Sequence, residues 1–126
     1  MKKLFILTIL ALFGMAFSPQ TDIEAIKQAF KSGNADEVAK YFDDYVDIKL
    51  LDKDEVKNIG RNQASIALKS FFSENGIKGF QKISDREIGT TMYMTGKLLN
   101  ASKGYNITVM MKQKGGKHVI ITIRIN

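Results

Sequence analysis

Acidic side chains that could transfer protons stand together at residues 43–47. Asp43 and Asp44 are adjacent, Tyr41 and Tyr45 flank them, and Asp47 follows. Enzymes use a carboxylate beside a second titratable group for general acid–base catalysis. The sequence offers no convincing second group here, and adjacent aspartates between two elements are ordinary turn residues. Asp43, Asp44 and Tyr45 are therefore candidate catalytic residues, with a polar turn as the preferred interpretation.

Other residue types that carry chemistry are scarce. His118 is the sole histidine, and strand alternation places it opposite Lys112 on a polar face, as an exposed residue. The chain has no cysteine, which excludes thiolate catalysis, iron–sulfur clusters and disulfide bonds. One histidine without cysteine does not make a metal site. We expect neither a metal nor another cofactor.

The last third of the chain, residues 105–126, predicts a β-hairpin with one apolar face, because apolar residues occupy its odd-numbered positions. A two-residue loop at Gly115-Gly116 would pair odd with even positions and mix the two faces. We therefore expect a three-residue loop, 114–116, whose last glycine forms a left-handed bulge. Met111 would then oppose Val119.

Three helices are predicted upstream of this hairpin. Thr21–Glu24 is a capping box that begins the first helix, and Gly33 ends it. Asn34 caps the second helix. The third helix follows Gly60 and has the widest apolar stripe of the chain, formed by Ala64, Ala67, Leu68, Phe71 and Phe72.

Strands are predicted at residues 45–51, 79–88 and 92–98, in addition to the hairpin. The charged run at residues 52–55 ends the first of them as a solvated loop. In the third, Met94 and Leu98 continue the apolar face and would oppose Met111 and Ile107. The resulting order is α-α-β-α-β-β-β-β, an α+β domain in which three helices cover one antiparallel sheet.

This order resembles that of a known group of proteins, and three segments support the likeness: Lys31-Ser32-Gly33-Asn34, Tyr41-Phe42-Asp43-Asp44 and Lys114-Gly115-Gly116-Lys117. The chain resembles a family of small exported bacterial proteins of unknown function in the nuclear transport factor 2-like (cystatin-like) superfamily. The resemblance covers essentially all of residues 19–126. It implies a cone-shaped, strongly curved antiparallel sheet with a pocket between sheet and helices, often in a dimer. Because members of the superfamily include enzymes and binding domains, the resemblance leaves the function open.

Two surfaces are candidates for binding. Apolar side chains could line an adaptable pocket, with ordinary core packing as the favoured alternative. The polar sheet face carries a basic group that could meet an anionic envelope surface or an acidic protein. Only Tyr93 could stack on a base there, so we expect no nucleic-acid binding. The pocket residues are Phe42, Phe72, Met94, Val109, Met111 and Ile121, and the basic residues are Lys97, Lys112, His118 and Arg124.

The N-terminal residues predict export. Lys2 and Lys3 precede an apolar run at residues 4–17, and Ser18 follows, which is typical of a secretory signal peptide. The run is shorter than the roughly 18 apolar residues of a membrane-spanning helix. We assign residues 1–18 to the signal and 19–126 to a single domain, with no membrane span after cleavage.

Charge separates the domain into two halves. Residues 19–60 have 6 Lys and Arg against 10 Asp and Glu, whereas residues 61–126 have 11 against 3. This asymmetry suggests self-association of the basic sheet with the acidic helical end. The leading hypothesis is a noncatalytic exported domain that binds a small apolar ligand or a partner protein. The alternatives are a small isomerase or dehydratase-type lyase that uses an Asp of residues 43–47, and a structural homodimer associated with the envelope.

Overall fold

The structure, a computed structural model, describes residues 21–126; the predicted signal peptide lies outside this range. The predicted α+β fold and its order of elements are confirmed. A short strand, β2, is an addition that the sequence analysis did not predict. The elements are α2 (Thr21–Lys31), α3 (Ala35–Ala39), β1 (Phe42–Leu50), β2 (Val56–Gly60), α4 (Arg61–Glu74), β3 (Gly79–Ile88), β4 (Thr91–Leu99), β5 (Gly104–Lys114) and β6 (Lys117–Ile125).

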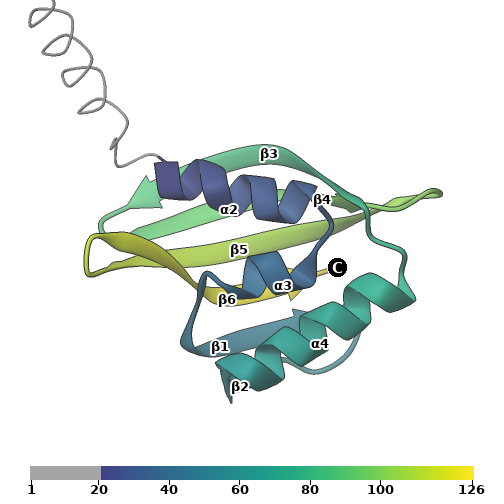
Figure 1. Ribbon diagram of the computed structural model, residues 1–126, viewed down its shortest axis with the longest axis horizontal. Helices are drawn as coiled ribbons and strands as arrows, with labels where there is room; N and C mark the ends of the chain where they lie inside the picture. Colours follow the sequence, from purple (N-terminus) through teal and green to yellow (C-terminus); the bar gives the residue numbers. More distant parts are fainter. Residues whose placement is uncertain (1–20) are drawn as a thin grey trace, which may run out of the picture.

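The six strands form one curved sheet in the order β2-β1-β6-β5-β4-β3, and the three helices lie on one face of it (Figure 1). Neighbouring strands are antiparallel except β1 and β6, which run parallel. The sheet is therefore mixed at this one contact, although the sequence predicted antiparallel pairing throughout. The pairing of β1 with β6 joins the first and last strands of the chain in the middle of the sheet.

Local sequence explains where the helices begin and end. Asn34 lies before α3, and its Oδ1 accepts hydrogen bonds from the backbone N–H groups of Asp36 and Glu37, at 3.0 and 3.4 Å. These bonds satisfy amides that have no partner inside the helix, which confirms the predicted cap. After α4, the backbone N–H of Asn75 donates to the carbonyl of Phe71 and closes the last turn.

The β5–β6 hairpin has a register different from the predicted one. Gly115 and Gly116 both have positive φ values, 60° and 79°, and form a two-residue turn. Met111 opposes Ile120, not Val119, and Ile121 is left as a bulge. The prediction of a three-residue loop was wrong. A two-residue turn pairs odd with even positions next to the turn, and the bulge then shifts the pairing by one residue, so that apolar side chains farther along the two strands again share a face.

The β4–β5 pairing also differs from the prediction, by two residues. Met94 opposes Val109 and Leu98 opposes Tyr105, where the sequence had suggested Met111 and Ile107. Because side chains alternate with a period of two, this shift keeps every apolar residue on the predicted face. The apolar face is therefore continuous despite the wrong register.

The core lies between this face and the helices. Phe30 of α2 packs against Phe80 of β3 with ring centroids 5.4 Å apart. Gly96 of β4 lies directly beneath the Phe80 ring, and a Cβ at this position would come within 2.6 Å of the ring and 2.4 Å of the Gln81 carbonyl oxygen. A side chain at residue 96 is therefore incompatible with this packing.

Candidate functional site

The residues predicted to line a pocket are mostly part of the core. Phe42, Met94, Val109 and Met111 are fully buried among other apolar side chains. Ile121 is the bulge residue of β6 and is half-buried. Phe72 is the one residue of this group that lines a depression described below. The sheet and helices therefore meet at a packed interface where these side chains lie.

The acidic residues at the start of β1 form ion pairs. The Oδ1 atom of Asp43 lies 2.7 Å from the Nζ of Lys114, and its Oδ2 lies 3.3 Å from the Nζ of Lys112. The backbone N–H of Asp44 also donates to Asp43 Oδ1 at 2.9 Å. The Asp44 carboxylate is more exposed and lies 2.9 Å from Arg61, whereas the Tyr45 side chain is exposed to solvent.

This arrangement determines the charge of Asp43. The hydrogen bond from Lys114 lowers the pKa of Asp43 to about 2, burial opposes this effect, and the Asp44 N–H and Lys112 add to it. Reciprocally, Asp43 raises the pKa of Lys114. A general acid needs a raised pKa, and a carboxylate with a pKa near 2 is a weak base at neutral pH. The cluster is thus arranged to hold charge rather than to transfer protons.

The predicted basic face is largely neutralised. Lys112 pairs with Asp43, and the Nε of Arg124 lies 2.8 Å from Glu55 Oε1. Lys97 is exposed and, among residues 21–126, has no ion-pair partner. The four residues therefore do not form one basic surface.

His118 was predicted to be an exposed residue of the polar face opposite Lys112, and this was wrong. The two-residue turn pairs it with Gln113 and directs it to the face that carries the helices. Its backbone N–H donates to the Asp22 carboxylate of α2 at 2.6 Å, and its Nδ1 lies 3.1 Å from the same carboxylate. Its Nε2 is buried, 3.7 Å from Glu87. His118 thus attaches the first turn of α2 to the sheet.

The two charged halves of the sequence compensate each other within one molecule. Acidic residues of the first half contact basic residues of the second half across the fold: Asp36 with Lys69, Asp43 with Lys112 and Lys114, Asp44 with Arg61, and Glu55 with Arg124. Ion pairs within one molecule therefore explain the charge asymmetry on which the self-association hypothesis was based.

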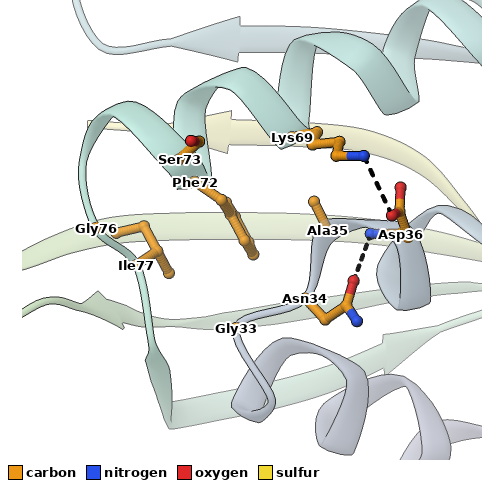
Figure 2. Close-up of a pocket in the computed structure, with 9 residues that line it drawn as sticks. All are labelled: Gly33, Asn34, Ala35, Asp36, Lys69, Phe72, Ser73, Gly76 and Ile77. Atoms are coloured by element: carbon orange, nitrogen blue, oxygen red, sulfur yellow. Dashed lines mark hydrogen bonds and ion pairs between the residues drawn. The ribbon is translucent and has the colours of Figure 1, made fainter.

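The site that remains is a groove between the α2–α3 turn and the C-terminal half of α4, with a volume of about 500 Å³ (Figure 2). We call it the α3–α4 groove. Its floor consists of the buried side chains Ala35, Phe72 and Ile77. Its rim is polar and includes Asn34, Asp36, Lys69 and Ser73. Lys69 Nζ lies 3.5 Å from Asp36 across the groove, so the rim's opposite charges face each other.

A separate hollow of about 320 Å³ borders α4 between the β1–β2 loop and the end of the helix. Ser70 and Glu74 line it from the helix, and Leu51 and Asp52 line it from the loop. Leu51 has a φ of +56°, a conformation that is uncommon for a large side chain. The hollow is lined by charged groups of both signs, Asp52, Lys53 and Glu74.

Comparison with known proteins identifies the family. The model of a domain of unknown function, DUF4783, matches residues 23–126. The chain belongs to the DUF4783 family. No curated protein matches its sequence.

Crystal structures of other DUF4783 proteins are similar to it. The protein from Bacteroides uniformis ATCC 8492 is 26% identical, with a TM-score of 0.74 over 82% of this chain and 94% of that one. The protein from Bacteroides ovatus ATCC 8483 is 24% identical, with a TM-score of 0.74 over 80% and 90%. An uncharacterised cystatin fold protein from Novosphingobium aromaticivorans is 14% identical, with a TM-score of 0.62 over 87% and 98%. A protein described as Rd1NTF2_04 with long sheet is 14% identical, with a TM-score of 0.62 over 86% of this chain and 100% of that one. These similarities confirm the nuclear transport factor 2-like fold.

Sequence reasoning missed the α3–α4 groove of this DUF4783 protein. Asn34 and Phe72 were recognised as a helix cap and an apolar residue, but Lys69, Ser73 and Ile77 had no signal of their own. The groove exists because two segments about 40 residues apart meet, and periodicity within one segment does not report such a contact. Among residues 21–126, no group of His, Cys, Asp and Glu could hold a metal ion, and no helix is long and apolar enough to cross a membrane.

Proposed function

We propose that this protein is a noncatalytic, exported binding domain that takes an apolar side chain of a partner protein into the α3–α4 groove. The observation that carries the proposal is the apolar floor of Ala35, Phe72 and Ile77 inside a polar rim. An apolar centre with a polar border is typical of surfaces that bind proteins. Export is supported by the signal-like residues 2–18.

The depth of the groove favours a protein over a small molecule. Phe72 and Ile77 are almost fully buried by their own neighbours, so the groove is shallow and offers limited apolar area. Small-molecule sites cover roughly 70–90% of their ligand's surface. A small apolar ligand would stay largely in water here, whereas a partner protein covers the same side chain with its own surface.

The ionisation of Asp43 argues against the alternative of an isomerase or lyase. Such an enzyme requires a carboxylate with a raised pKa inside a pocket. The pKa of Asp43 is lowered, and its two oxygens are engaged by Lys112 and Lys114. This cluster therefore supplies no observation in favour of catalysis.

Site-specific photocrosslinking in living cells tests the proposal. A photoreactive amino acid is placed at Ser73, which is exposed at the groove, or at Ser70, an exposed serine of the same helix that lines the other hollow. We expect a discrete protein adduct from position 73 and none from position 70. A further exchange, Lys69→Glu, should weaken the adduct because it places two acidic groups at the rim.

Adducts of equal yield from both positions, or none from either, would contradict the assignment of the groove. A small molecule retained in native mass spectrometry and displaced by Ser73→Arg, without any protein adduct, would favour the small apolar ligand instead. Export is tested separately, by the mass of the protein recovered from intact cells: removal of roughly 18 N-terminal residues is expected for a signal peptide of typical length.

A further inference from the structure

Residues 61–126 contain more lysines and arginines, 11, than their 3 aspartates and glutamates can neutralise. Residues 88–126 include no Asp or Glu. Lys112, Lys114 and Arg124 are compensated by carboxylates of β1 and the β1–β2 loop, which lie near them in the sheet. Five other basic side chains of residues 61–126 have no ion-pair partner among residues 21–126: Lys78, Arg86, Lys97, Lys103 and Lys117.

Three of the five, Lys78, Lys97 and Lys103, lie near the end of the β4–β5 hairpin. The hairpin extends beyond the neighbouring elements at the right of Figure 1. Lys97 and Lys103 are exposed there, and Lys78 is exposed beside Leu99, the last residue of β4. Among residues 21–126, none of the three has an ion-pair partner. We call Lys78, Lys97 and Lys103 the hairpin patch.

Packing holds two of these lysines in place without neutralising them. A Cβ at Gly104 would lie 3.3 Å from Lys97 Cδ, so the aliphatic part of Lys97 rests on the neighbouring strand where that strand has no side chain. The Nζ of Lys103 lies 4.7 Å from the centre of the Tyr105 ring. A ring face attracts the ammonium but leaves its net charge unchanged. The Lys97 side chain thus lies with Gly104 on the sheet face away from the helices, whereas the Lys103 ammonium lies over Tyr105 on the face that carries them.

We propose that the hairpin patch binds an anionic phospholipid surface. Its lysines lie on different strands and around a protruding tip, so they do not converge on a single anion. A surface with many phosphate groups can meet each of them separately, and lysines near such a surface each contribute to binding. The inference goes beyond the proposed partner binding, since the α3–α4 groove and the hairpin patch have no residue in common.

Asp52 of the β1–β2 loop is an acidic residue beside the patch. It borders the same hollow as Lys103, across from the start of β5. A carboxylate at this position opposes binding to an anionic surface because like charges repel. Its removal should therefore strengthen the interaction, which gives the test an effect in each direction.

The test uses residues 19–126, because the described residues pack around their own hydrophobic core and the apolar run at residues 4–17 would itself enter lipid. Protein is sedimented with vesicles of phosphatidylcholine alone or of phosphatidylcholine and phosphatidylglycerol in equal amounts. We expect binding to the mixed vesicles only, with a partition coefficient that falls steeply between about 0.01 and 0.5 M salt as the Debye length shortens.

Variants then locate the contact. Lys97→Gln and Lys103→Gln should each reduce the partition coefficient about fivefold, and the double variant about 25-fold. Asp52→Asn should raise it. The control is Lys69→Gln, because Lys69 is exposed but already paired with Asp36 and lies on α4. It should reduce binding less than either hairpin variant.

Three results would overturn the proposal. Equal sedimentation with both vesicle types would show that anionic lipid is not recognised. A loss for Lys69→Gln as large as that for Lys97→Gln would show that net charge, rather than the hairpin, governs binding. Displacement by millimolar glycerol phosphate would show a site for a single soluble anion rather than for a surface.

Discussion

Neutralising Asp43 should destabilise the protein in a way that depends on pH. The change from Asp43 to Asn keeps the shape of the side chain, and its Oδ1 can still accept the hydrogen bond from the Asp44 N–H. It removes the negative charge that Lys112 and Lys114 surround. The variant therefore isolates the electrostatic contribution of these ion pairs.

The pKa of Asp43 sets the magnitude. Lowering the pKa from its ordinary value of 3.8 to about 2 corresponds to roughly 2.5 kcal/mol, at about 1.4 kcal/mol per pH unit. The side chains of Lys112 and Lys114 are 44% and 52% exposed, although that of Asp43 is only 12% exposed. Since solvent screens partly exposed pairs, we expect a loss of about 1–1.5 kcal/mol in the free energy of unfolding at neutral pH.

The pH dependence follows from the direction of the change. A carboxylate whose pKa is lower in the folded than in the unfolded state stabilises the fold above its unfolded pKa. That contribution disappears as the pH falls from about 4 through about 2. The difference between the wild type and Asp43→Asn should thus be constant from neutral pH down to about 5 and then shrink.

Urea unfolding followed by circular dichroism measures this difference at a series of pH values. Asp44→Asn is the matched control, because the Asp44 side chain is 68% exposed and should contribute less than about 0.5 kcal/mol. Equal losses for the two variants would refute the reasoning. So would a difference for Asp43→Asn that persists unchanged at about pH 2, where the wild-type carboxyl is protonated in the unfolded state and about half protonated in the folded state.

Three further predictions concern packing and turns. Gly96→Ala should cost about 3 kcal/mol or more in thermal unfolding, because its Cβ would meet Phe80 and the Gln81 carbonyl, whereas Gly60→Ala, with no atom within 4 Å, should change stability by less than about 0.5 kcal/mol. His118→Ala should remove the side-chain contact between residue 118 and the Asp22 carboxylate, cost about 1–3 kcal/mol and speed hydrogen exchange in α2; unchanged exchange there would contradict the role of His118. Gly115→Ala should cost about 1 kcal/mol and Gly115→Asn almost nothing, since an Asn-Gly pair suits a turn with positive φ at both residues.

Much of the fold could be predicted because the signals are local. Asn34 caps α3 through its own side chain, and the stripe that includes Leu68 and Phe72 is buried on one face of α4. Such patterns depend only on residues three or four apart. β2 was missed because its five residues are mostly exposed and show no strand alternation. Its pairing with β1 stabilises it as a strand, although its own sequence shows no strand pattern.

The hairpin shows where local reasoning fails. Alternation and two glycines were read correctly as strands and a turn, but the number of turn residues and the bulge at Ile121 together set the register. Either a three-residue loop or a two-residue turn with a bulge keeps the apolar face intact. The sequence pattern is the same for both, so the pairing in space decides between them.

The candidate site depended still more on tertiary structure. Asp43 and Lys114 are 71 residues apart, and no spacing rule predicts that they meet. Because of this contact, Asp43, a candidate catalytic residue in the sequence, forms an ion pair. The same fold places His118, which was predicted to be exposed, against Asp22 in the first turn of α2. The acidic and basic halves of the chain likewise neutralise each other at positions that the packing of helices and the strand order bring together.

The sequence by itself determined the three helices, five of the six strands among residues 21–126, the apolar faces of α4 and β4, and the exclusion of thiolate chemistry, because these properties belong to residue types and short-range periodicity. Only the tertiary structure decided that the predicted pocket residues are core, that Asp43 is held ionised, and that a groove and a charged hairpin end remain at the surface. The physical reason is distance along the chain. Contacts between remote segments depend on register and strand order, and several registers satisfy the same local pattern.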